Sequence, residues 1–510
     1  MIHALTAAGA RAAEERAVAG GGIALADLMD RAGASVAREI ERRSADGPLA
    51  VMCGGGNNGG DGWVAARGLA EAARQVTVFT TVAPADLPGI AGEAAQAAVA
   101  AGVTVVEPGD APMDPDALAG FSAVVDALFG VGFSGEVRSP FGAWIEAVNA
   151  TGALVVSVDV PSGLDASTGR IAAHAVRADV TVTFSAPKVG TILFPGAGLV
   201  GELVVADIGI PREYLGSPGD PEVWDAEDYR ALLPRPAPDA HKNSRGRVLI
   251  VAGSGAFPGA ATLAAMGAQR MGAGYVTVAV PESVVGVLQS KLTSAIVMGL
   301  PENPSHTLAS KVTDAVIDIA REFDAVVLGP GMTVAHGAVH VARALVGALD
   351  VPLVVDADGL NALVDTVDTV TGRDAPTVIT PHPGELARLL GTTPAGIQAD
   401  RLGYGRMLSG PHLTCVLKGA HTVVSGRERQ VVTLAGNPGL ATAGTGDVLA
   451  GMAGALLAQG LGPFEASALA AYLHARAGDH ASAALTTLSV VAEDIPAYLP
   501  VAICELDSTI

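Results

Sequence analysis

Short apolar runs alternate with alanine-rich amphipathic stretches along the whole chain. The runs of the first part cover residues 48–53, 76–82, 123–130, 154–160, 180–185 and 203–210, and those of the second part cover 247–254, 275–282, 325–331, 352–359, 377–382, 413–419 and 421–426. Near-continuous β-branched runs separated by helices are typical of parallel strands buried on both faces. The pattern predicts an α/β protein built from parallel sheets, each covered by helices on both sides.

A change in composition divides the chain. Residues 217–246 are rich in Pro, Asp and Arg, whereas the flanking segments are rich in Ala and Val. We interpret this stretch as a linker with a short helix, and we expect one domain over 1–217 and another over 223–503. The two parts show no aligned internal repeat, and the residues after Pro500 are expected to form a frayed tail.

Composition excludes several classes of protein. The 510 residues carry a net charge of −21 with no basic cluster, which disfavours nucleic acid or an anionic membrane as a partner. No apolar run approaches the roughly 18 residues of a membrane span, the first twenty residues lack a signal-peptide core, and three distant cysteines form no disulfide framework. We expect a soluble, cytoplasmic protein.

One loop of the first domain is unusually rich in glycine. In GGGNNGGDG, residues 54–62, the polar side chains are Asn57, Asn58 and Asp61, and no lysine follows, which separates the loop from a P-loop. Glycine there suits a backbone that turns tightly or approaches a ligand. The position between a strand and a helix predicts a ligand site without a cationic side chain.

Two further strand ends carry polar residues. Asp126 lies in VVDALFGVGFSGEV, and Asp159 and Ser162 lie in VVSVDVPSGLDASTG. A lone aspartate after a strand usually caps a helix or completes a turn. Three polar positions at the carboxyl edge of one sheet indicate a site. These segments hold no His, Cys or Lys, so we expect carboxylate chemistry and oxygen ligands for a hard cation.

GGGNNGGDG, DALFGVGFSG and DVPSGLDASTG together resemble the NAD(P)H-hydrate epimerase family, over roughly residues 1–215. The resemblance implies a Rossmann-like fold and interconversion of the R and S epimers of NADH or NADPH hydrated at C6 (NADHX and NADPHX). It implies potassium ligands from Asn58, Asp126 and Ser162. It implies a substrate pocket lined by Asn57, Asn58, Gly59, Gly60, Asp61, Gly130, Val131, Gly132, Phe133, Ser134, Gly135, Glu136 and Asp159.

The residues present suit that reaction. A C6 hemiaminal can lose hydroxide, pushed by the ring nitrogen, and regain water on the other face. A carboxylate that gives and takes a proton assists both steps. We expect Asp159 to be this group and rank Asp126 second.

The strongest local pattern of the second domain is GNPGLATAGTGDVLAGMAGALLAQG, residues 436–460. A glycine-rich turn opens a long apolar helix, whose first amides form an anion hole for phosphate. Asp447 could simply cap that helix, but a cap does not explain the glycines and threonine before it. Glycine-rich entry plus aspartate is typical of phosphoryl transfer, in which the aspartate takes a hydroxyl proton.

The same stretch, with LGPGM, VVDADGLNAL, TPHPGEL and KGAHTVV, resembles the ADP/ATP-dependent NAD(P)H-hydrate dehydratases of the ribokinase-like superfamily, over about residues 230–500. The resemblance implies dehydration of the S epimer by phosphorylation and elimination, with Mg²⁺ on the nucleotide and Asp447 as base. It implies hydrate contacts from Ala261, Gly331, His382 and Asp447. It implies nucleotide contacts from Lys418, Gly419, Ala420, His421, Thr422 and Gly446.

Some of these positions keep a simpler interpretation. Lys418 ends a strand, where a lone lysine is usually solvated, and the alternative for His382 is a histidine that completes its proline-bounded turn. Asp356 and Asp358 are structural or magnesium-associated and rank below Asp447. Because HKNSRG departs from the family's usual pattern, nothing is assigned to Asn243 or Ser244.

Two other functions compete with the expected pair of activities. One is a hydroxyl kinase acting on a thiamin or pyridoxine precursor, with the first domain as a sensor. The other treats the first domain as a binding scaffold, which the joint presence of Asn58, Asp126, Asp159 and Ser162 disfavours. ADP is the expected donor, with ATP as the alternative, and we expect a homo-oligomer.

Overall fold

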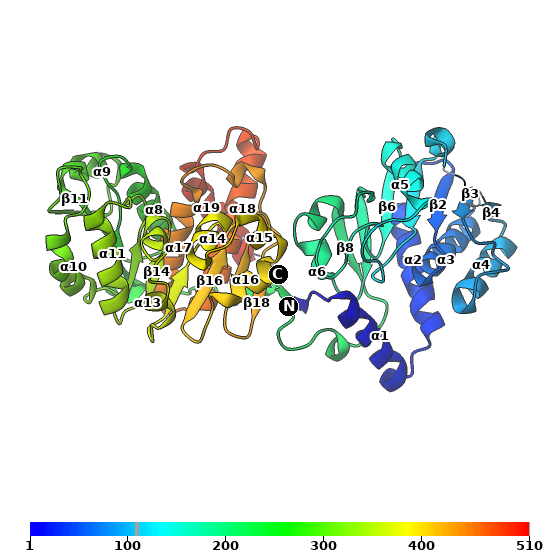
Figure 1. The fold of residues 1–510 in the computed structure, drawn as a ribbon, viewed down its shortest axis with the longest axis horizontal. Helices are drawn as coiled ribbons and strands as arrows, with labels where there is room; N and C mark the ends of the chain where they lie inside the picture. The colour runs from blue at the N-terminus through cyan, green and yellow to red at the C-terminus, as the bar shows by residue number, and fades with distance from the viewer. Residues whose placement is uncertain (108–110, 112, 509–510) are drawn as a thin grey trace. The chain divides into compact units, whose positions relative to one another are not determined.

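The computed structural model describes residues 1–107, 111 and 113–508, and these divide into two compact units, a first over 2–221 and a second over 222–508 (Figure 1). Both units are α/β, as the alternating pattern predicts. Among the helices of these residues, none combines the length and the apolarity that a membrane crossing requires.

Strands β2 to β8 of the first unit form a parallel sheet in the order β4-β3-β2-β5-β6-β7-β8. Their bounds are β2 Leu49–Cys53, β3 Val76–Thr80, β4 Thr104–Val106, β5 Ala123–Ala127, β6 Leu154–Val158, β7 Val180–Phe184 and β8 Glu202–Ala206. The central strands are wholly buried, which is why they read as continuous apolar runs.

Helices cover both faces of this sheet. The bounds are α1 Ala7–Gly21, α2 Leu25–Arg43, α3 Asn57–Glu71, α4 Gly89–Ala100, α5 Phe141–Ala150 and α6 Val189–Ile192. One face buries Trp63 of α3 with apolar residues of α2 and α4, and the other buries Trp144 of α5. Helix α1 packs against Ala186 and Ile208 through Ala10, Ala13 and Ala17.

In the second unit the sheet runs β9-β18-β17-β16-β15-β14-β13-β10-β11-β12. The strands are β9 Glu222–Val223, β10 Arg247–Val251, β11 Tyr275–Pro281, β12 Ile296–Leu300, β13 Ala325–Leu328, β14 Leu353–Val355, β15 Thr377–Ile379, β16 Leu413–Leu417, β17 Val423–Ser425 and β18 Gln430–Val432. From β12 to β16 all neighbours are parallel.

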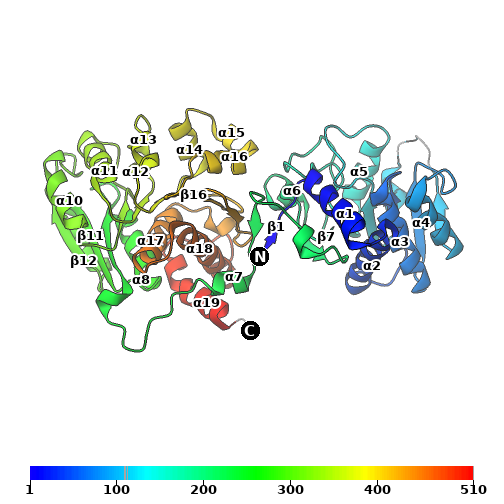
Figure 2. The ribbon, with the colours of Figure 1, turned by 90° about the horizontal axis from the view of Figure 1, so that it is seen from below.

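Two helical layers enclose that sheet (Figure 2). One comprises α8 Pro258–Arg270, α17 Thr445–Ala458, α18 Pro463–Leu485 and α19 Asp494–Ser508, whose apolar side chains form one core with the strands. The short helices α7 Ala226–Arg230 and α9 Val285–Lys291 join the same core through Tyr229 and Leu288. The remaining helices are α10 Thr313–Ala320, α11 His336–Ala348, α12 Asp358–Asn361, α13 Asp368–Thr371, α14 Pro383–Leu390, α15 Pro394–Ala399 and α16 Arg401–Met407.

The structure corrects three expectations. β16–β17 and β17–β18 are antiparallel, because their short connections leave no room for a parallel crossover. The runs at 104–106 and 296–300 are strands although the pattern did not single them out. The end of the chain is no frayed tail: α19 continues through Pro500 to Ser508, and Ala502 and Leu506 are buried.

Candidate active sites

The chain order of the first sheet reverses at β2. β3 and β4 extend to one side of β2, and β5 returns to the other. Ligands of open parallel sheets bind outside the carboxyl ends of the strands at such a reversal. The segments that leave β2 and β5 begin at Gly54 and Leu128, so the glycine loop and the loop over 130–136 start from the same edge.

Most glycines of the 54–62 loop serve packing. A Cβ on Gly54 would lie 2.0 Å from the Leu128 carbonyl oxygen, and one on Gly59 would lie 1.9 Å from that of Gly54. Gly60 and Gly62 are less crowded, since a Cβ there would lie 2.5 Å from the Met29 methyl carbon and 2.6 Å from the Ala127 Cβ. The glycines therefore bring α3 close to the sheet, and the polar residues at its start are set at the strand ends.

Asp126 is fully buried, and its carboxylate accepts four hydrogen bonds. Its carboxylate accepts from the Ser162 hydroxyl at 2.5 Å, the Ser162 amide and the Ser157 hydroxyl at 2.8 Å, and the Leu128 amide at 3.4 Å. Burial raises the Asp126 pKa, and the bonds from Ser162 oppose that shift. The structure thus brings Asp126 and Ser162 together in one network.

Asn58 reaches the same edge. A Cβ on Gly130 would lie 2.7 Å from its Oδ1, so only glycine fits at 130. The Asn58 amide nitrogen is buried and has no hydrogen-bond partner within the described structure. A buried amide nitrogen without a protein acceptor is suited to donate a hydrogen bond to a ligand.

Asp159 pairs with a lysine that the motif analysis left without a role. The Lys188 ammonium lies 2.6 Å from Asp159 Oδ1 and also donates to the Thr183 hydroxyl and the Phe184 and Ala186 carbonyls. Both side chains are buried. Asp159 Oδ2 accepts no hydrogen bond from any described residue, so it is available to a substrate. Asp159 also has a φ of +64°, an uncommon conformation for a residue other than glycine.

Two further carboxylates, Asp61 and Glu14, lie close enough to Asp159 for its charge to shift their pKa values. Burial raises the pKa of Asp61, and the charges of Asp159 and Glu14 raise it further. Burial and the Asp159 charge likewise raise the Glu14 pKa. Glu14 lies on α1, beside the alanines that pack on Ala186. Sequence reasoning missed Glu14 and Lys188, although Lys188 is the only lysine among residues 1–241.

The loop over 130–136 is more open. Phe133 stacks on Phe129 with ring centroids 5.3 Å apart, and Val131 packs against the α1 cluster. Exposed positions of this edge are Asn57, Gly132, Ser134, Gly135 and Glu136. The loop therefore has an apolar anchor and an exposed rim.

In the second unit, Asp447 lies in the first turn of α17, which follows Gly444 with a φ of +99°. Its carboxylate has no hydrogen bond to any described residue. Burial, then the charge of Asp356, raises the Asp447 pKa to about 7, against an opposing effect of Lys418. A carboxylate with such a pKa can act as a base at neutral pH.

Lys418 is no solvated strand end. Its ammonium lies 2.7 Å from Asp356 Oδ1 and 3.7 Å from Glu385 Oε2. A Cβ on Gly446 would lie 3.2 Å from the same nitrogen. Lys418 therefore places a positive charge beside the amino end of α17 and near Asp447.

His382 caps α14. Its Nδ1 accepts from the Gly384 and Glu385 amides, and the Glu385 carboxylate accepts from the His382 amide at 2.8 Å. The neutral ring therefore carries its proton on Nε2, and half of the side chain is exposed. His382 completes a turn, and its half-exposed ring places Nε2 3.5 Å from Glu385 Oε1.

The other expected contacts vary in accessibility. Ala261 is fully buried on α8, and Gly331, with a φ of +66°, follows β13. The turn Lys418–Thr422 joins β16 to β17, and buried Arg401 donates to the Leu417 carbonyl at 2.9 Å beneath it. The turn is thus held by Arg401, and the Lys418 side chain by Asp356 and Glu385. Sequence reasoning gave no role to Arg401 or Glu385.

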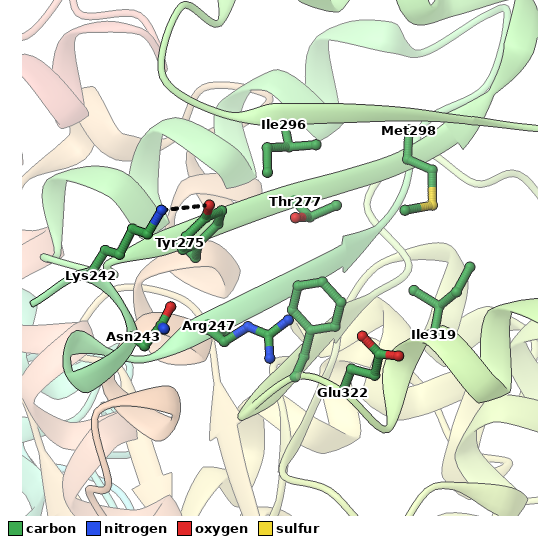
Figure 3. A pocket seen from close by; sticks show the side chains of 10 residues that line it. Lys242, Asn243, Arg247, Tyr275, Thr277, Ile296, Met298, Ile319 and Glu322 are labelled. Carbon is green, nitrogen blue, oxygen red and sulfur yellow. Dashed lines mark hydrogen bonds between the residues drawn. The ribbon is translucent and has the colours of Figure 1, made fainter.

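A separate hollow of about 590 Å³ lies at the opposite edge of the sheet (Figure 3). It is lined by Lys242, Asn243, Arg247, Tyr275, Thr277, Ile296, Met298, Ile319, Glu322 and Phe323. Arg247, Tyr275 and Ile296 begin their strands, whereas Lys418 and Asp356 follow theirs. The hollow shares no residue with the site around Asp447.

Both units match families of known proteins. Residues 248–501 match the family described as NAD(P)H-hydrate dehydratase, and residues 25–190 match the one described as YjeF-related protein N-terminus. A bifunctional NAD(P)H-hydrate repair enzyme of Moorella thermoacetica is 41% identical over 95% of this chain and 93% of its own. The chain belongs to the family of bifunctional NAD(P)H-hydrate repair enzymes. The family member of Thermofilum pendens is 39% identical over 93% of this chain and 91% of its own.

A solved structure resembles the second unit of this NAD(P)H-hydrate repair family member. The ADP/ATP-dependent NAD(P)H-hydrate dehydratase from Bacillus subtilis, co-crystallised with ATP and Mg²⁺, is 27% identical. The match covers 56% of this chain and 98% of that one, with a TM-score of 0.49.

Proposed function

We propose that this protein repairs hydrated NADH and NADPH in two steps. The first unit interconverts the R and S epimers, and the second dehydrates the S epimer with ADP, or ATP, as phosphoryl donor. The observation that carries the proposal is that a family match across both units coincides with a polar cluster at the carboxyl edge of each sheet.

In the first unit, Asp159 is the proposed proton carrier. When the C6–O bond breaks, the ring nitrogen supplies the electron pair, and an acid must protonate the departing hydroxide. When water returns to the other face, a base must take its proton. Asp159 Oδ2 serves these transfers, while Lys188, which holds Oδ1, fixes the carboxylate in place. Asp126, the second-ranked carboxylate, already accepts four hydrogen bonds and suits a binding role better.

Asn58, Asp126 and Ser162 fit a potassium ion. Amide, carboxylate and hydroxyl oxygens are the ligands that hard cations prefer. Asn58 Oδ1 lies beside Gly130, and Asp126 and Ser162 are joined by a hydrogen bond of 2.5 Å. Bound there, potassium supplies a fixed positive charge beside the hydroxylated ring. The residues 57–61 and 130–136, with Asp159, orient that ring.

In the second unit, Asp447 takes the proton of the C6 hydroxyl as its oxygen attacks the terminal phosphorus of the nucleotide, which breaks the bond to the bridging oxygen and releases AMP from ADP, or ADP from ATP. The hydroxyl then becomes a phosphate ester, and the ring nitrogen expels phosphate, which leaves far more readily than hydroxide. Loss of a proton from the neighbouring ring carbon completes the dehydration. The amides at the start of α17 and Lys418 stabilise the negative charge of the transferred group. Ala261, Gly331 and His382 are the proposed hydrate contacts, and Lys418–Thr422 with Gly446 hold the nucleotide.

Mg²⁺ is proposed to enter with the nucleotide phosphates. In the described part of the chain no three acidic, histidine or cysteine side chains gather as a metal site. Asp356 Oδ1 accepts hydrogen bonds from the Lys418 ammonium and from the Thr380 hydroxyl, each at 2.7 Å. The expected cytoplasmic location and homo-oligomeric state stay predictions.

Separated R and S hydrates test the proposal. Asp447→Ala should abolish dehydration of the S epimer and leave epimerisation intact, and Asp159→Ala should do the reverse. A hydroxyl kinase would instead release a stable phosphorylated product from another alcohol. Normal dehydration by Asp447→Ala would refute the assignment of the second site.

A further inference from the structure

One helix holds the glycine-rich segment that leads into Asp447. Residues 436–446 run alongside α18, and three α18 side chains bond to that segment: His474, Asp479 and Ser482. The contacts lie at both ends of the segment. α18 contributes no residue to the proposed nucleotide or hydrate contacts, so these bonds need another explanation.

His474 is buried and bonds to a backbone carbonyl. Its Nε2 lies 2.9 Å from the carbonyl oxygen of Thr445, the first residue of α17. A carbonyl oxygen only accepts, so Nε2 must carry the proton and donate it. Burial, together with the smaller effect of the Lys418 charge, lowers the His474 pKa to about 4 against the opposing bond to Thr445, so the ring is neutral near pH 7.

The bonded carbonyl belongs to the peptide unit that supplies the Gly446 amide. Because a peptide unit is planar, the direction of the Thr445 carbonyl fixes the direction of the Gly446 N–H. That amide is one of the first donors of α17, next to Asp447 and beside the Lys418 ammonium. The Thr445 hydroxyl also donates to the Leu440 and Thr442 carbonyls, at 3.0 Å each.

The other end of the segment is fixed by Asp479. One of its oxygens accepts from the Gly436 amide at 3.2 Å, and the other accepts from the Asn437 side chain at 2.9 Å. Ser482 donates to Asn437 Oδ1 at 2.6 Å. Gly478 lacks a side chain where a Cβ would lie 2.6 Å from Leu440. α18 thus matches the segment in shape as well as in hydrogen bonds.

We propose that His474 is a positioning residue for phosphoryl transfer: by donating to the Thr445 carbonyl it orients the Gly446 amide toward the transferred phosphate, while Asp479 anchors the far end of the segment. The inference rests on the proposed dehydratase function of the second unit. It adds to that function two residues that contact neither substrate.

The test compares His474→Gln with His474→Leu. A glutamine amide nitrogen reaches nearly as far as imidazole Nε2 and can donate to the carbonyl, whereas leucine cannot. Since a misplaced group can cost about 100-fold in rate, we expect kcat for dehydration of the S hydrate to fall about 10- to 100-fold in His474→Leu. KM for the hydrate should change little, and His474→Gln should keep most of the rate. Epimerisation by the same chain is the internal control.

Equal losses in both variants, or a wild-type kcat in His474→Leu, would overturn the proposal. If His474→Leu fails to fold, His474→Asn replaces it, because its shorter amide reaches only the Nδ1 position. Hydrogen exchange at the Gly446 amide gives a readout without any reaction: it should speed up in His474→Leu and not in His474→Gln. Faster exchange beside an inactive wild type would refute the dehydratase function alone, and unchanged exchange would refute the positioning.

Discussion

The Lys188 ammonium lies 2.6 Å from Asp159 Oδ1, and the two side chains are buried together at the carboxyl edge of the first sheet. The hydrogen bonds that the described residues donate to this carboxylate all go to Oδ1, and Oδ2 receives none of them. A buried ion pair of this kind is costly to break from one side, because the remaining charge has no compensation.

Lys188→Met should therefore impair epimerisation. The variant keeps most of the side-chain length, removes the charge and leaves Asp159 without its fixed orientation. We expect the rate of R-to-S conversion to fall about 100-fold, the scale of general acid–base assistance. Chiral separation of the hydrates after incubation measures it. Dehydration of pure S hydrate should stay at the wild-type rate, and an unchanged epimerisation rate would show that the ion pair has no part in the reaction.

Dehydration should depend on pH through Asp447. Burial and the Asp356 charge raise the Asp447 pKa to about 7, and a base acts only when it is deprotonated. The kcat/KM for the S hydrate should thus be full above pH 7 and decline as the pH falls below it. Asp447→Asn should lose about 1,000-fold above pH 7, and its residual rate should not decline with the wild-type pH profile. A pH-independent kcat/KM between pH 6 and 8 would contradict Asp447 as the base.

Epimerisation should require potassium. Removal of monovalent cations from the buffer should slow R-to-S conversion and leave dehydration of the S hydrate unaffected. Asn58→Ala removes one proposed ligand and should raise the potassium concentration needed for half-maximal epimerisation by about 10-fold or more. Potassium titrations of wild type and Asn58→Ala, with sodium as the matched ion, measure this. Equal rates in both salts would argue against the proposed potassium site.

His474 should make the protein less stable in acid. Its pKa is about 4 in the folded chain and about 6.5 when unfolded, so the unfolded chain binds the proton more readily. The stability that the neutral ring contributes is present above pH 6.5 and is lost as the pH falls toward 4, on the order of 3 kcal/mol. Urea unfolding at pH 7 and pH 5 should show a smaller loss for His474→Gln than for the wild type. Identical losses would place the acid sensitivity elsewhere.

The sequence predicted the elements and the edges of the sites better than the partners within them. Asp126, Asp159 and Ser162 were placed because each follows an apolar run, and parallel strands end at one edge. Lys188 pairs with Asp159 from 29 residues away, and Lys418 pairs with Asp356 from 62 residues away. Such pairs depend on which strands become neighbours, which no local pattern shows.

The glycines of the 54–62 loop also show that packing decides the role of a residue. Their number suggested close approach to a ligand, yet Gly54 and Gly59 are required by the backbone of the protein itself. Likewise, Lys418 looked like a solvated strand end until the fold placed Asp356 and Glu385 beside it. Residue type indicated the chemistry in each case, and the packing decided which group it served.

The most direct test uses a mixture of R and S hydrates of NADH with the full-length protein, ADP, Mg²⁺ and K⁺. The near-ultraviolet absorbance of reduced nicotinamide reports the recovered NADH. The account predicts complete recovery in the wild type, and recovery of only the S fraction in Asp159→Ala. No recovery with either ADP or ATP would contradict the repair function, and wild-type recovery that stops at the S fraction would contradict the epimerase activity.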